Sequence, residues 1–114
     1  MRALPRQSWR LRIYCAEGDR HGREPLYEAI VRAAHEAGLA GATVSKGSMG
    51  YGADSHIHTS RVLRLAEDQP VLVELVDDRE HVDAFVPRLR ELDFRGLVTL
   101  EPVEVLLQSA SATD

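Results

Sequence analysis

The sequence contains little that could crosslink, anchor or extend the chain. Its 114 residues include one cysteine, Cys15, which cannot form a disulfide within the chain and suits a reducing compartment. No apolar run approaches the roughly 18 residues that cross a bilayer, and no apolar signal-peptide segment follows the N-terminus. Internal repeats and low-complexity linkers are also missing. We therefore expect a cytoplasmic protein without direct membrane insertion.

An excess of basic residues is missing as well. The formal net charge is −4, and the 14 Lys and Arg residues are interspersed among 18 Asp and Glu residues. Nucleic-acid binding needs a basic stripe that neutralises phosphates, so we expect no nucleic-acid partner. Hydrophobic residues make up 44% of the chain and charged residues 28%, as in ordinary soluble domains. We predict one domain over residues 8–107, with disordered segments at 1–7 and 108–114.

Hydrophobic periodicity predicts the elements of the first half. Apolar residues alternate over 8–16, which indicates a strand with one buried face. After Pro25, apolar residues recur at helical spacing until Gly38, a candidate C-cap. Further strands are predicted over 41–49, 61–65 and 71–76.

A second helix and a last strand complete the chain. Asp77 and Asp78 offer an N-cap for this helix, and Gly96 ends it. Pro87 lies inside the helical stripe and should kink the helix or shift its start. The final extended segment, 97–107, is interrupted at Pro102.

This order of elements predicts an α+β fold, the ferredoxin-like β-α-β-β-α-β two-layer sandwich. Its two helices cover one face of the sheet. The other face carries a mixture of charged and apolar residues: Arg10, Arg12, Tyr14, Thr43, Ser45, Leu72, Glu74, Val76 and Thr99. One interpretation is self-association, with Arg12 and Glu74 pairing near subunit boundaries. The other is the half-wet face that antiparallel sheets tolerate.

The most unusual segment is the glycine-rich stretch from Gly47 to Thr59. Gly47, Gly50 and Gly52 would allow positive φ and a close approach of a ligand, so the loop could hold a phosphate. It is neither a P-loop nor a dinucleotide fingerprint, because no Gly-Lys-Ser/Thr ends it and a strand follows. The alternative is a hairpin tip with turn-forming glycines.

His56 and His58 form a His-x-His pair with a spacing that can bind a transition metal. No cysteine or second histidine cluster completes a ligand set nearby, so we predict no metal. His58 is expected to hydrogen-bond a phosphate or to stabilise the loop.

No catalytic constellation stands out. Cys15 lies on the apolar side of the first strand and is expected to be a buried structural thiol. His21, His35 and His81 are expected to be solvated surface groups. We predict no catalytic residue, no cofactor and no enzymatic activity.

Several blocks of sequence resemble the family called domain of unknown function 190. The blocks are Leu11-Arg12-Ile13-Tyr14, Pro25-Leu26-Tyr27-Glu28-Ala29-Ile30-Val31, Ala37-Gly38-Leu39-Ala40-Gly41-Ala42-Thr43-Val44, Gly47-Ser48-Met49-Gly50-Tyr51-Gly52, Ile57-His58-Thr59, Leu63-Arg64-Leu65, Glu67-Asp68-Gln69-Pro70-Val71 and Gly96-Leu97-Val98-Thr99-Leu100-Glu101. The resemblance covers roughly residues 10–106. It implies a PII-like fold that assembles as a homotrimer with the sheets facing one another.

The resemblance also implies a function. PII-like proteins bind small effectors, often adenine nucleotides, in clefts between subunits and report them to a membrane transporter or an enzyme. Carried over by position, the ligand-binding residues would be Gly47, Ser48, Gly50, Gly52, His58, Thr59, Arg61, Arg95 and Gly96. The chain lacks the Gly-Asp-Gly and paired basic residues with which PII proteins clamp ATP, which leaves Arg61, Arg64 and Arg95 as phosphate partners. The alternative function is a trimeric metal-responsive protein that binds a divalent cation through its loop histidines.

Overall fold

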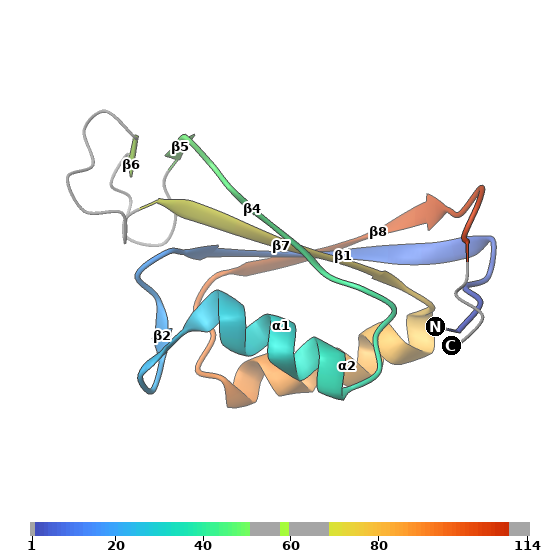
Figure 1. The fold of residues 1–114 in the computed structure, drawn as a ribbon, viewed down its shortest axis with the longest axis horizontal. Helices are drawn as coiled ribbons and strands as arrows, with labels where there is room; N and C mark the ends of the chain where they lie inside the picture. The colour runs from blue at the N-terminus through green and yellow to red at the C-terminus, as the bar shows by residue number, and fades with distance from the viewer. Residues whose placement is uncertain (1, 51–57, 60–68, 110–114) are drawn as a thin grey trace.

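The computed structural model describes residues 2–50, 58–59 and 69–109. Its centre is a four-stranded antiparallel sheet in the order β4-β7-β1-β8, and both helices lie on one face of it (Figure 1). The main elements are β1 (Gln7–Ala16), α1 (Leu26–Glu36), β4 (Thr43–Lys46), β7 (Pro70–Asp77), α2 (Arg79–Glu91) and β8 (Leu97–Glu104). The predicted β-α-β-β-α-β order and the ferredoxin-like topology are confirmed.

Two short strand pairs extend this framework at one end of the molecule. β2 (Arg20–His21) pairs with β3 (Glu24–Pro25) in the connection between β1 and α1. β5 (Met49–Gly50), which follows β4, pairs with β6 (His58–Thr59). The predicted strand over 41–49 is therefore split into β4 and β5, while the predicted strand over 61–65 lies outside the described residues.

The core lies between the sheet and the helices. Alternate residues of β1 and β7 point into it, and they meet the apolar stripes of α1 and α2. The residues of this core cluster are Leu11, Ile13, Leu26, Ile30, Ala33, Ala34, Val73, Leu75, Val82, Phe85 and Leu89. The apolar residues that alternate or recur at helical spacing in the sequence are thus the residues that the fold buries.

The end of α1 is the one predicted. Gly38 has a φ of +80°, a left-handed conformation that costs least for glycine. Its N–H donates to the carbonyl of His35 at 3.1 Å, and the Leu39 N–H donates to that of Ala34 at 3.1 Å. These two bonds form a Schellman motif, which satisfies carbonyls at the end of the helix.

The course of α2 tests two predictions. The helix begins at Arg79 and continues through Pro87, so of the two effects predicted for the proline the shifted start does not occur. Pro87 is exposed, where water can hydrogen-bond the carbonyl that lacks a donor. The helix ends with Leu92 as C-cap, and Asp93 takes the left-handed conformation at φ 59°, so Gly96 is not the residue that ends the helix.

Pro102 does not interrupt the last strand. β8 runs through it, and Pro102 lies opposite Trp9 of β1. Because β8 is an edge strand of the sheet, a residue without an N–H is tolerated there.

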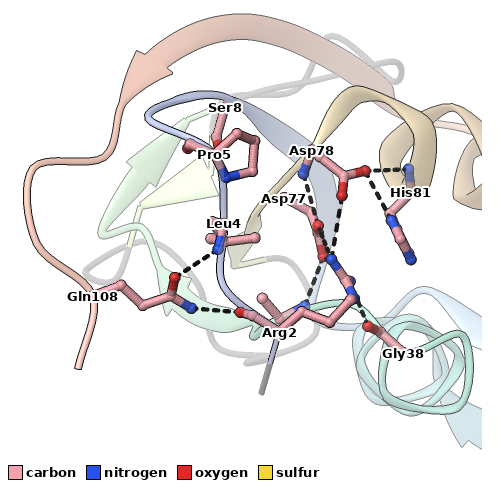
Figure 2. Close-up of polar contacts among 10 residues, drawn as sticks. Arg2, Leu4, Pro5, Ser8, Gly38, Asp77, Asp78, His81 and Gln108 are labelled. Carbon is pink, nitrogen blue, oxygen red and sulfur yellow. Dashed lines mark hydrogen bonds and ion pairs between the residues drawn. The ribbon is translucent and has the colours of Figure 1, made fainter. Parts of the chain in front are cut away.

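The N-terminal segment is attached to the domain (Figure 2). The Arg2 guanidinium donates to both carboxylate oxygens of buried Asp77 at 2.9 and 2.8 Å, and to the carbonyl of Gly38 at 2.8 Å. The Leu4 N–H donates to the side chain of Gln108 at 2.7 Å. These contacts hold residues 2–4 against the domain. The predicted domain bounds and disordered ends stay a prediction.

The sheet face opposite the helices carries the residues predicted for it. Arg12 lies opposite Glu74 in the register, and Tyr14 lies opposite Leu72. Arg12 Nε and Glu74 Oε2 are 3.3 Å apart in the same chain. A second copy is therefore not needed to pair these charges, and both interpretations of this face stay predictions.

Candidate functional site

The predicted ligand segment begins where β4 ends. Gly47 and Ser48 lead into β5, in which Gly50 pairs with His58 and Met49 with Thr59. The structure thus brings two parts of the predicted site, 47–50 and 58–59, side by side. The other predicted residues of this segment, Gly52 and Arg61, lie outside the described residues, as do His56 and Arg64.

In this segment Gly47 is explained by a close contact, and neither Gly47 nor Gly50 by its backbone angle. A Cβ added to Gly47 would lie 2.9 Å from Pro70 Cγ, and one added to Gly50 would lie 3.4 Å from the same atom. Among the described residues, the glycines with positive φ are Gly22 and Gly38. The prediction of positive φ at Gly47 and Gly50 is therefore wrong. At Gly47 the missing side chain lets the chain pass the Pro70 ring, whereas a Cβ at Gly50 would make an ordinary van der Waals contact.

Arg95 and Gly96 lie at the same end of the sheet but on its other edge. A Cβ on Gly96 would be 1.9 Å from the Tyr14 carbonyl oxygen of β1, so this glycine lies directly against the strand backbone. The Gly47 N–H donates to the Pro70 carbonyl at 2.8 Å, and Pro70 lies opposite Ala16 of β1. Three strand spacings, roughly 14 Å, separate the two edges. One chain alone does not bring these two predicted segments together.

A polar cluster beside Gly47 was not predicted. Lys46, the last residue of β4, places its ammonium 2.7 Å from Glu17 Oε1 and 5.4 Å from the centroid of the Tyr27 ring. The Tyr27 hydroxyl lies 3.5 Å from the same carboxylate oxygen. The hydrogen bond to Glu17 raises the pKa of Lys46, which keeps its ammonium charged. Glu17 follows β1, Lys46 ends β4 and Tyr27 lies in the first turn of α1. These residues are distant in the sequence, and the fold brings them together.

Unpaired polar atoms occur in the same region. Among the described residues, the buried side-chain atoms without a hydrogen-bond partner are Glu17 Oε2 and His21 Nδ1. His21 is half-buried with this nitrogen enclosed, and His81 is half-buried with its ring 2.8 Å from Asp78, so neither is the fully solvated group that was predicted. His35 is exposed, as predicted.

Cys15 is a half-buried thiol, which agrees only in part with the predicted buried one. It packs against the core, and burial, helped by the charges of Asp19 and Glu17, raises its pKa to about 12. A thiol with such a pKa stays protonated at neutral pH and is a poor nucleophile.

One other group could be considered for a metal. Asp77, Asp78 and His81 offer ligand atoms within 4.8 Å of one another. Figure 2 shows that the Arg2 guanidinium lies against both carboxylates. Asp78 caps α2 by accepting from the His81 N–H at 2.8 Å. Burial alone would raise the pKa of Asp77, but its hydrogen bonds from Arg2, Asp78 and Ala40 outweigh burial and lower it. This group is accounted for as a structural ion pair and a helix cap.

None of the described helices is both long and apolar enough to span a bilayer.

Comparison with known proteins supports the fold and identifies the family. A UPF0166 protein from Aquifex aeolicus is 35% identical over 96 residues, which is 84% of this chain and 90% of the relative. A UPF0166 protein from Methanocaldococcus jannaschii is 37% identical over 96 residues, covering 83% of this chain and 88% of the relative.

Solved structures of PII-like proteins have the same fold. CPII, a nitrogen regulatory PII-like protein from Thiomonas intermedia K12 bound to ADP, AMP and bicarbonate, matches with a TM-score of 0.65 and 17% identity, covering 87% of this chain and 88% of that chain. The GlnK–ATP complex from B. subtilis matches with a TM-score of 0.57 and 11% identity, over 88% and 86% of the two chains. The fold is PII-like. Residues 8–105 match the DUF190 family, described as "Uncharacterized ACR", and the chain belongs to this family.

Proposed function

We propose that the protein is a PII-like regulatory protein that binds a small anionic effector, with an adenine nucleotide as first candidate. The effector would lie in clefts between subunits of a homotrimer, and its binding would regulate a membrane transporter or an enzyme. The role is one of binding and signalling, without catalysis.

The observation that carries this proposal is the position of the two ligand segments. Gly47 to Gly50 and Arg95-Gly96 lie at one end of the sheet but on opposite edges. If the chain forms a closed ring, the β4 edge of one copy can meet the β8 edge of the next, and both segments then face one cleft. Arg95 is exposed and forms no ion pair with any described residue, so its guanidinium is free to bind a phosphate.

The nucleotides bound to structural neighbours support the choice of effector. CPII is described with ADP and AMP, and GlnK with ATP. At these low sequence identities the matches show a shared fold. That a nucleotide is the effector of this protein is our proposal.

Thermal unfolding with ATP, ADP, AMP and cyclic AMP tests the proposal. A ligand at 100 times its dissociation constant adds about 2.7 kcal/mol to the free energy of unfolding, so the melting temperature should rise with at least one nucleotide. An unchanged melting temperature with all four would contradict nucleotide binding.

A matched pair of arginine variants tests the site. Arg95→Gln should weaken binding of that nucleotide about tenfold, because a charged hydrogen bond to phosphate is lost. Arg90→Gln is the control, because Arg90 is also an exposed arginine but lies in the last turn of α2. Equal losses in both variants would show general electrostatics and no site at Arg95.

A further inference from the structure

We propose that Lys46 binds the anionic group of the effector and that Glu17 competes with this group for the same ammonium. The inference deepens the proposed function and rests on it for the position of the anion site. It assigns a binding residue that neither the resemblance nor the glycine pattern indicates.

The position of Lys46 is the first argument. It is the last residue of β4 and directly precedes Gly47, where the predicted ligand segment begins. Its side chain is 43% exposed, so a solute can reach it from outside. An ammonium on a flexible stem can turn from one partner to another without movement of the backbone.

The surroundings of Lys46 favour an anion. Its ammonium already holds an anion, the Glu17 carboxylate, which accepts from Lys46 at 2.7 Å. The ammonium also lies 5.4 Å from the centroid of the Tyr27 ring, whose hydroxyl is 3.5 Å from the same carboxylate oxygen.

The Glu17 carboxylate is only partly satisfied in this position. Oε1 has Lys46 and the Tyr27 hydroxyl as partners, whereas Oε2 is buried and has none. A carboxylate held by one oxygen is a weaker partner for Lys46 than a phosphate, which offers more acceptor oxygens and more charge. Glu17 also repels an arriving anion through its own charge. Both effects make Glu17 a competitor that an effector has to displace.

Titration calorimetry with inorganic pyrophosphate as the probe tests this competition in the full-length protein. Lys46→Gln should bind pyrophosphate about tenfold more weakly, because a charged contact is lost. Glu17→Gln should bind it several-fold more tightly, because Lys46 loses its competing partner while the size of the side chain is kept. Lys46→Arg should retain most of the affinity, which separates loss of charge from loss of structure.

Arg6→Gln and Glu104→Gln are the controls. They break an exposed arginine–glutamate pair, 3.0 Å apart, where β8 ends opposite Gln7 at the other end of the sheet. Both controls should bind pyrophosphate like the wild type.

The outcomes separate this inference from the proposed function. Nucleotide binding with equal pyrophosphate affinities in wild type, Lys46→Gln and Glu17→Gln would overturn the role of Lys46 and leave the effector proposal standing. Pyrophosphate binding that changes as expected, without any nucleotide effect, would support Lys46 and reject the nucleotide. A wild type that does not bind pyrophosphate, or a Glu17→Gln variant that binds it more weakly, would overturn the inference.

Discussion

At the scale of single residues, Gly96 shows how one missing side chain lets two strands meet. It follows the turn after α2 and precedes β8, where the chain passes the backbone of β1. The carbonyl oxygen of Tyr14 occupies the place of a Cβ, at 1.9 Å. The obstacle is backbone inside a sheet, which cannot turn aside as a flexible side chain can.

Gly96→Ala should therefore destabilise the protein by about 2–4 kcal/mol, because β8 must shift to admit the methyl group. Urea unfolding followed by circular dichroism measures this loss. Gly41→Ala is the control, since a Cβ at Gly41 meets nothing within 4 Å and its φ is not positive. Equal midpoints for the two variants would show that β8 has room to move.

At the scale of elements, two adjacent carboxylates connect β7, α2 and the N-terminal segment. Asp78 caps α2 through the His81 N–H. Asp77 is fully buried and accepts from Arg2, Ala40 and the Asp78 N–H. The sequence offered both residues as caps, and only the fold assigns them different partners.

Arg2→Gln should lower the free energy of unfolding by about 1–3 kcal/mol at pH 7, because the buried Asp77 loses a charged donor. The pKa of Asp77 is lowered in the folded protein from its ordinary 3.8. Its contribution is therefore fully present above pH 3.8 and is lost as the pH falls through the lower folded-state pKa.

Urea unfolding at pH 7, 5 and 3 checks this dependence. The difference between wild type and Arg2→Gln should be equal at pH 7 and 5 and should begin to shrink at pH 3. Arg6→Gln, which breaks an exposed pair with Glu104, should cost less than about 1 kcal/mol at pH 7. A difference between wild type and Arg2→Gln that persists unchanged in stronger acid would show that the loss comes from packing and not from the carboxylate.

At the scale of the whole molecule, the sheet face without helices exposes apolar side chains that a second copy could cover. Leu72, Tyr14 and Leu97 lie side by side across β7, β1 and β8 and form an apolar row. Leu97 is 59% exposed and Tyr14 38% exposed. The neighbouring charges are already paired within the chain, since Arg10 and Arg12 contact Glu74 and Glu101. A face of paired charges and an apolar row can be buried without leaving a charge unpaired.

We expect the wild-type protein to sediment as a trimer at micromolar concentration. Leu97→Asp should shift this equilibrium towards monomers, because it places an unpaired charge in the apolar row. Ala84→Asp, at an exposed position of α2, changes the net charge equally and should leave the trimer intact. Sedimentation velocity measures both variants. A monomeric wild type would remove the clefts on which the proposed function depends.

The sequence alone determined the parts of this protein that depend on local periodicity. Alternation in β1 and β7, helical spacing in α1 and α2, and Gly38 at the end of α1 each follow from which face of an element is buried and from the φ that a residue can adopt. The order of these elements then left one simple topology, and the open sheet face followed because two helices, the number predicted from the sequence, cover one face.

Only the tertiary structure decided the contacts between distant segments. The pairing of Lys46 with Glu17, the use of Arg2 against Asp77 and the passage of Gly96 beside Tyr14 join residues between 29 and 82 positions apart. None of these leaves a local pattern, because each depends on which strand ends lie together in the folded sheet. The reason for a glycine at positions 47 and 96 is likewise visible only in the fold, because it lies in the neighbouring atom that a side chain would meet.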